Sequence, residues 1–256
     1  MDIQLIRHAT LVVTLGDLKL LVDPMLSPAR AMDPVANAAN QRRIPLVDLP
    51  FGDAALAQLL AQIDGVLVTH THRDHWDARA AELIAKETPV LCQPEDAAGI
   101  RDAGFTQVQP IEQTYEWRRL QLTRTGGQHG TGQMGQQMGP VSGFVIRGAS
   151  IPSLYIAGDT IWCAEVAAAL EAHRPDVIVL NAGSAQFLTG DPITMTASDV
   201  VQVCDALPST QVVAVHMEAI NHCLLTRADL REQLRVAGRL DRVRLPQDGE
   251  TLAFGA

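Results

Sequence analysis

Residues 69–77 read T-H-T-H-R-D-H-W-D, which places three histidines and one aspartate within six consecutive positions. Histidine accounts for only 8 of the 256 residues, so this density is unusual for the composition. Imidazole nitrogens and carboxylate oxygens are ligands that zinc, manganese and iron accept. The segment therefore predicts half of a metal site, built from His70, His72, Asp74 and His75. The alternative is a surface loop in which the histidines are coincidental.

The residues around this motif predict how it is built. Ile63 to Thr69 is apolar and partly β-branched, which favours a buried strand. The first two histidines lie two positions apart in extended chain, so their side chains point the same way. Asp77 can cap a helix that runs to about Lys86. The motif aspartate and the third histidine fall in the turn before this helix, so one segment can serve two neighbouring metal ions.

The strand-end H-x-H-x-D-H motif followed by a helix resembles the metallo-β-lactamase superfamily of metal-dependent hydrolases. Later signatures of the superfamily follow in order: His129 lies in G-G-Q-H-G-T-G, Asp159 in L-Y-I-A-G-D-T, and His216 ends V-V-A-V-H. The resemblance implies an α/β protein with the αβ/βα four-layer sandwich, two mixed sheets flanked by helices, as a single domain over residues 1–256.

The same resemblance implies the roles of the site residues. His70, His72 and His129 would hold one metal ion; Asp74, His75 and His216 would hold the second; and Asp159 would bridge the two. We expect two divalent ions, with zinc first and manganese or iron as alternatives.

A finer resemblance is to the branch that contains ascorbate-6-phosphate lactonase and N-acyl-phosphatidylethanolamine phospholipase D. It is carried by I-R-H-A-T-L-V-V at residues 6–13, L-L-V-D-P at 20–24 and M-T-A-S-D-V-V at 195–201. This branch implies hydrolysis, and it favours a lactone or ester only because it contains a lactonase.

The predicted chemistry follows from the paired metal ions, which lower the pKa of a shared water towards neutrality. We expect a metal-bound hydroxide to attack a small-molecule ester or lactone, with Asp74 as the catalytic carboxylate that orients this nucleophile. One alternative is a phosphodiesterase with the same two-metal site. The other is a metal-binding module without activity.

Three further features are candidates for the substrate pocket. His222 lies six residues after a predicted ligand and is interpreted as a substrate contact or proton donor, with a structural hydrogen bond as the alternative. His8 ends a predicted strand and either lines the site or has a structural role. Gly126 to Pro140 carries six glycines together with Met134 and Met138, which predicts a substrate flap rather than an irregular connector.

Composition restricts the partners. The net charge is −9 and no run of Lys or Arg offsets it, which disfavours nucleic acid and favours a small-molecule substrate. No apolar run approaches the roughly 20 residues that span a bilayer. The N-terminus lacks an apolar signal core, and the four cysteines form no C-x-x-C pair, so a cytoplasmic location is expected. A homo-oligomer is compatible with this sequence.

Strand-like runs alternate with helical stretches along the chain. A hairpin is predicted around Gly16-Asp17, between one strand over residues 4–13 and another over 19–23. Further strands are predicted over 63–69, 89–92, 107–111, 119–125, 142–147, 153–157, 177–181 and 212–216. Helices are predicted over 53–62, 77–86, 164–172, 197–207 and 226–237.

Overall fold

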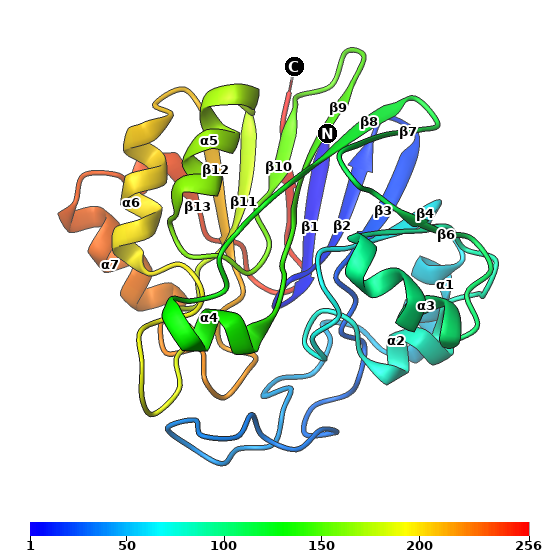
Figure 1. Cartoon of the computed structure of the whole chain (residues 1–256), viewed down its shortest axis with the longest axis horizontal. Coiled ribbons are helices and arrows are strands. Elements are labelled where there is room, and N and C mark those ends of the chain that lie inside the picture. The colour runs from blue at the N-terminus through cyan, green and yellow to red at the C-terminus, as the bar shows by residue number, and fades with distance from the viewer. Residues whose placement is uncertain (256) are drawn as a thin grey trace.

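Apolar strands in both halves of the chain build two mixed sheets, and the computed structural model, which describes residues 1–255, packs them face to face (Figure 1). Each sheet has seven strands. Helices cover the two outer faces, so the layers follow the order helix, sheet, sheet, helix. The predicted αβ/βα sandwich is confirmed.

The first sheet contains the strands that precede the histidine motif. Its order is β14-β1-β2-β3-β4-β5-β6, antiparallel from β14 to β3 and parallel from β3 to β6. The strands are β1 Asp2–Arg7, β2 Thr10–Leu15, β3 Leu18–Val22, β4 Gly65–Val68, β5 Val90–Cys92, β6 Val108–Pro110 and β14 Thr251–Ala253.

The second sheet has the order β13-β12-β11-β10-β9-β8-β7, with parallel pairing from β10 to β13. Its strands are β7 Thr114–Trp117, β8 Leu120–Thr125, β9 Gly143–Gly148, β10 Leu154–Ile156, β11 Val177–Asn181, β12 Gln211–Val215 and β13 Val243–Arg244. The paired strands β11 and β12 are buried almost throughout, as expected for parallel strands with both faces covered.

The helices divide between the two outer layers. One group packs on the first sheet: α1 Asp53–Leu60, α2 Ala78–Leu83 and α3 Ala97–Asp102. The other packs on the second sheet: α5 Ala164–His173, α6 Ala197–Ala206 and α7 Arg227–Val236. Helix starts follow local chemistry, because Asp77 and Thr226 each accept a hydrogen bond from a backbone N–H of the first turn. None of these helices, within residues 1–255, has the length and apolar character needed to cross a bilayer.

Two sequence predictions about local structure are wrong. Residues 4–13 do not form one strand, because the chain reverses at His8 between β1 and β2. His8 has a φ of 61°, so a single residue with left-handed backbone makes the turn without a glycine or proline to mark it. Gly126–Pro140, predicted to be a loop, contains the short helix α4 Gly132–Met138. Glycine lowers helix propensity, so the local sequence did not indicate this short helix.

Candidate metal centre

The seven predicted ligands lie at one edge of the two facing sheets. Four of them directly follow β4, Asp159 follows β10, and His216 follows β12. His129 follows β8, which runs in the same direction as β10 because both are antiparallel to β9. Residues at the carboxyl ends of strands that run in the same direction meet at one edge. The fold therefore brings together segments that are far apart in the chain.

The first predicted ligand group is a compact set of three imidazoles. His70 Nε2 lies 3.0 Å from His72 Nδ1. The ring of His129 has its centroid 5.6 Å from that of His70 and 5.3 Å from that of His72. One nitrogen from each of the three residues lies within 4.8 Å of the others. This spacing suits a cation held by all three rings.

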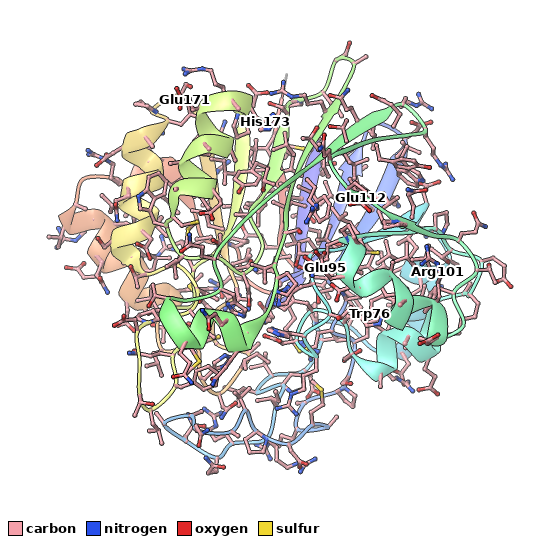
Figure 2. The ribbon with its side chains drawn as sticks, in the orientation of Figure 1. Trp76, Glu95, Arg101, Glu112, Glu171 and His173 are labelled. Carbon is pink, nitrogen blue, oxygen red and sulfur yellow. The ribbon has the colours of Figure 1, made fainter. Side chains whose placement is uncertain are left out.

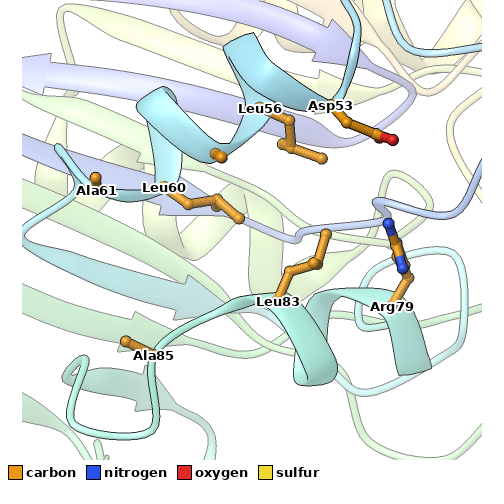
Figure 3. A pocket seen from close by; sticks show the side chains of 8 residues that line it. Asp53, Leu56, Leu60, Ala61, Arg79, Leu83 and Ala85 are labelled. Carbon is orange, nitrogen blue, oxygen red and sulfur yellow. The ribbon is translucent and has the colours of Figure 1, made fainter.

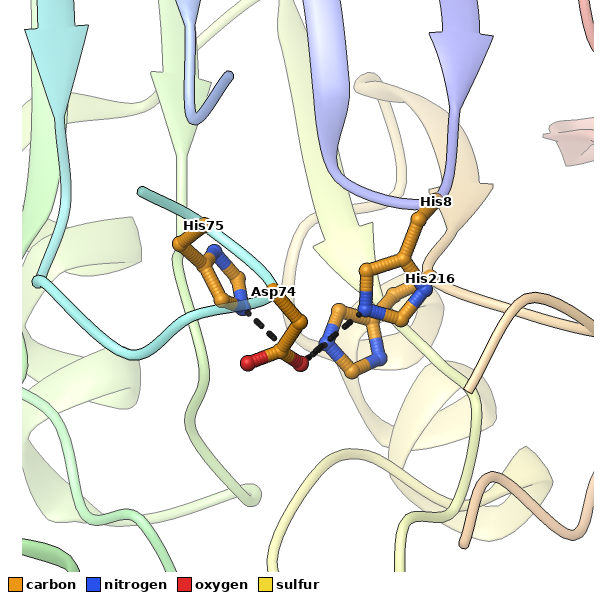
Figure 4. Close-up of side chains that lie close together, drawn as sticks. All are labelled: His8, Asp74, His75 and His216. Carbon is orange, nitrogen blue, oxygen red and sulfur yellow. Dashed lines mark hydrogen bonds and ion pairs between the residues drawn. The ribbon is translucent and has the colours of Figure 1, made fainter. Parts of the chain in front are cut away.

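The second predicted group surrounds one carboxylate oxygen. Asp74 Oδ2 lies 3.6 Å from His216 Nε2 and 3.8 Å from His75 Nε2 (Figure 4). A third imidazole that the resemblance did not assign also reaches this oxygen, since His8 Nε2 lies 3.2 Å away. Three imidazoles therefore converge on the Asp74 carboxylate.

Asp159 lies between the two groups and contacts both. Its Oδ2 atom lies 3.5 Å from His129 Nε2 in the first group and 3.2 Å from His75 Nε2 in the second. Its Oδ1 atom lies 3.3 Å from His216 Nε2. This is the position that a carboxylate shared by two ions requires. The role of Asp159 as the bridging ligand itself stays a prediction.

Outer contacts orient the ligand side chains, and sequence reasoning assigned none of them. Asp23 Oδ2 lies 2.8 Å from His75 Nδ1, and Asp23 also accepts hydrogen bonds from the backbone and side chain of Thr69. Asn181 donates to Asp159 Oδ1 at 2.7 Å. Partners of this kind fix the ring tautomer and orientation of metal-binding histidines. The L-L-V-D-P segment was the available signal for Asp23, because its aspartate directly follows a strand.

The motif turn is also anchored by packing. The Trp76 ring lies 5.3 Å from that of Phe105, in an edge-to-face arrangement within the core under the first helical layer. Figure 2 shows Trp76 beside α2 and α3, whereas His173 lies at the end of α5. Glu218 lies two residues after His216, but its carboxylate pairs with Arg227.

The donor set fits divalent cations. His75 Nε2 and His216 Nε2 are buried and have no hydrogen-bond partner within residues 1–255, although carboxylate oxygens face them. Burial acts to raise the pKa of Asp159, but His216 and His75 outweigh it and hold this pKa well below its usual value. Burial likewise acts to lower the pKa of His75, yet Asp159, Asp74 and Asp23 raise it to about 10. Buried ionised carboxylates facing imidazole nitrogens form a site that a cation completes.

A cavity of about 210 Å³ opens over the centre. Its floor includes His72, Asp74, His129 and Asp159, and Arg73 adds one cationic side chain. The remaining wall consists of Val35, Ala36, Met138, Phe187 and His222. The predicted flap, residues 126–140, therefore contributes to the cavity, and so does the loop between β3 and α1, which supplies Val35 and Ala36.

His222 lies where the sequence suggested, in the cavity wall. The residue is 6% exposed, and its ring packs against that of Phe187 with a centroid distance of 5.6 Å. Its Nδ1 atom is buried and finds no hydrogen-bond partner in the described chain. Burial lowers the pKa of His222 to about 4, so the ring is neutral at pH 7.

Another cavity, of about 280 Å³, lies between α1 and α2 and is lined largely by Leu56, Leu60, Leu83 and neighbouring alanines (Figure 3). Asp53 and Arg79 stand at its rim. Its lining, within the described residues, shares no side chain with the metal centre. This cavity is therefore separate from the metal centre.

Two facing mixed sheets with a buried histidine and aspartate centre at one edge define a metal-dependent hydrolase with the metallo-β-lactamase fold. The family described as "Beta-lactamase superfamily domain" matches residues 19–217, and the chain belongs to this superfamily.

Relatives and solved structures agree with this assignment over the full length. The UPF0173 protein YddR of Bacillus subtilis is 35% identical, over 99% of this chain and 100% of that protein. The crystal structure of isothiocyanate hydrolase from Delia radicum gut bacteria is 38% identical, with a TM-score of 0.94 and full coverage of both chains. A possible metal-dependent hydrolase from Veillonella parvula is 34% identical, with a TM-score of 0.95 and 99% coverage of both.

Proposed function

We propose that the chain binds two divalent metal ions and hydrolyses small molecules at an electrophilic carbon, with isothiocyanates as the first candidate substrates. The observation that carries the two-metal proposal is Asp159, whose two carboxylate oxygens face imidazoles of both ligand groups. Zinc is the first candidate ion, because tetrahedral sets of imidazole and carboxylate suit it, and manganese and iron accept the same ligands.

Metal ions in this site would supply Lewis acidity and an activated water at neutral pH. The chain's own contribution is to orient the reacting groups. Asp74 is the more accessible of the two central carboxylates, with 13% of its side chain exposed against 3% for Asp159. It also lines the cavity, and one of its oxygens is held by imidazoles. Asp74 is therefore the group that can hold the attacking water and accept its proton.

The isothiocyanate proposal is supported by the hydrolase with 38% identity over both full chains. The balanced reaction is R–N=C=S + H₂O → R–NH₂ + COS. Water oxygen bonds to the central carbon and one proton moves to nitrogen, which forms the thiocarbamic acid R–NH–C(=S)–OH. The carbon–nitrogen bond then breaks, and the hydroxyl proton moves to nitrogen as the amine and carbonyl sulfide leave.

The cavity suits a small substrate with an uncharged body. Val35, Met138 and Phe187 provide apolar wall for the organic group R. His222 is neutral at pH 7, so it would contact the substrate through a hydrogen bond rather than as an imidazolium acid. Arg73 at the cavity offers a second polar contact.

Carboxyl esters and lactones form the second candidate class. They are of similar size, and they present an electrophilic carbon to the same activated water. The apolar wall formed by residues such as Val35, Met138 and Phe187 favours both carbon classes over a phosphodiester, which is charged.

The test compares phenethyl isothiocyanate with phenyl-bearing ester, lactone and phosphodiester substrates, all on protein whose metal content is measured by mass spectrometry. We expect about two metal ions per chain and carbonyl sulfide release from the isothiocyanate. His72→Ala and Asp159→Asn should lower both metal content and turnover, whereas the control His173→Ala should change neither. If protein that carries two metal ions hydrolyses only the phosphodiester, or none of the substrates, the proposed reaction is refuted. Protein that takes up no metal would refute the whole assignment.

A further inference from the structure

His8 lies inside the metal centre but belongs to neither predicted ligand group. It makes the turn between β1 and β2 with a φ of 61°, and it is fully buried. Its carbonyl oxygen accepts a hydrogen bond of 2.9 Å from the backbone N–H of His216. Its ring packs on the His216 ring with a centroid distance of 3.6 Å. Backbone and ring contacts together fix where the imidazole lies.

The fixed ring reaches the carboxylate of the second group. His8 Nε2 lies 3.2 Å from Asp74 Oδ2, which is shorter than the distance from that oxygen to either predicted histidine ligand (Figure 4). Its donor atom also lies within 4.8 Å of those of Asp74, His75 and His216. Two roles are compatible with this position: a further metal ligand, or a hydrogen-bond donor to Asp74.

The other ring nitrogen distinguishes these roles. A neutral histidine that binds metal through Nε2 carries its proton on Nδ1. When this N–H group is buried, it needs a hydrogen-bond acceptor. His75 has Asp23 and His129 has the Ile193 carbonyl, each at 2.8 Å. His8 Nδ1 is buried and meets no hydrogen-bond partner anywhere in residues 1–255. A metal-bound Nε2 would therefore leave a buried N–H without an acceptor, which is costly.

We infer that His8 is a positioning residue: its Nε2–H donates to Asp74 Oδ2 and holds this carboxylate for its role at the metal centre, and His8 is not a metal ligand. The proton on Nε2 leaves only a lone pair at the buried Nδ1, and a charge-assisted hydrogen bond forms with the carboxylate. The inference rests on the proposed function for the role of Asp74.

The experiment compares three variants by metal content and by the visible absorption of the cobalt(II)-substituted protein. His8→Ala should retain two metal ions per chain but shift the cobalt bands, because Asp74 loses its donor. His216→Ala, which removes a predicted ligand, should lose about one ion. His8→Gln should restore the wild-type bands, since its amide nitrogen can donate from nearly the same place as Nε2.

Turnover gives a second reading of the same variants. For His8→Ala we expect kcat to fall roughly 10- to 100-fold with little change in KM, the range typical of groups that orient ligands, and His8→Gln should recover most of this loss. Thermal unfolding checks that each variant is folded. If His8→Ala loses a metal ion as His216→Ala does, His8 is a ligand. If His8→Gln and His8→Ala show the same shift of the cobalt bands and the same loss of kcat, the role of His8 is packing. Wild-type protein without metal would instead contradict the proposed function.

Discussion

Asp23 illustrates how one buried side chain supports the centre without belonging to either ligand group. It is 1% exposed, and its carboxylate connects His75 Nδ1 to the backbone and hydroxyl of Thr69, the residue directly after β4. The contact orients His75 Nε2 towards Asp159. Changing Asp23 therefore tests the orientation of a ligand without removing one.

We predict that Asp23→Asn lowers metal affinity about 10- to 100-fold, because an amide accepts the His75 proton more weakly than a carboxylate does. Affinity is measured by competition with a chromogenic chelator. Asp102→Asn, an exposed substitution at the end of α3, is the matched control and should leave affinity unchanged. Equal affinities for Asp23→Asn and wild type would contradict the orienting role.

Metal binding should also depend on pH in a stated direction. Nearby carboxylates raise the pKa of His75 in the metal-free protein to about 10, so this imidazole carries a proton at pH 7 that a metal ion must displace. Affinity is therefore expected to rise with pH up to about 10 and to fall as pH decreases. Calorimetric titration in two buffers of different ionisation enthalpy measures the released protons. Binding without proton release would show that His75 is neutral before the metal arrives.

At the scale of elements, close backbone contacts decide where ligands point. The loop after β11 passes very close to the loop after β12. A Cβ added to Gly183 in the first loop would lie 2.0 Å from the carbonyl oxygen of His216 in the second. Only glycine allows this approach.

Gly183→Ala is therefore expected to displace His216 and to reduce binding of the second metal ion, with a loss of stability of about 1–3 kcal/mol, the usual range for overpacking. The control is Gly99→Ala in α3, where an added Cβ meets no heavy atom within 4 Å among the described residues other than those of the adjoining helix backbone. That change should increase stability by roughly 0.5–1 kcal/mol, because alanine favours helix. Urea unfolding and metal content measure both effects. Wild-type behaviour of Gly183→Ala would show that the loop relaxes freely.

At the scale of the whole molecule, the centre links the two halves of the sandwich. His70 and His75 come from the first sheet, while Asp159 and His216 come from the second, so bound metal ions would hold the two sheet edges together. The wide apolar core between the sheets supports the fold independently, with members such as Leu67, Phe144 and Val213. Metal removal should therefore destabilise the protein without unfolding it.

We predict that a chelator lowers the melting temperature of the metal-loaded protein. A metal ion that binds only the folded state adds about 4 kcal/mol to the free energy of unfolding when its free concentration is 1,000 times Kd. For a chain of this size the shift should be about 8–16 °C, at roughly 2–4 °C per kcal/mol. Scanning calorimetry with and without chelator measures it. His216→Ala should show a smaller shift than wild type. An unchanged melting temperature would mean that the metal does not link the halves.

Local sequence patterns indicated an α/β protein and the histidine motif, and the resemblance that this motif carries implied the sandwich fold and the remaining ligands. The strand before the H-x-H-x-D-H motif is indicated by local apolar periodicity. The helix caps at Asp77 and Thr226 rest on hydrogen bonds within a few residues. Tertiary structure alone decided the rest. Asp23 meets His75 across 52 positions, and His8 meets Asp74 across 66. Such contacts arise only when strands that are far apart in the chain align in one sheet, here β1, β3 and β4 of the first sheet, and no local pattern encodes that pairing.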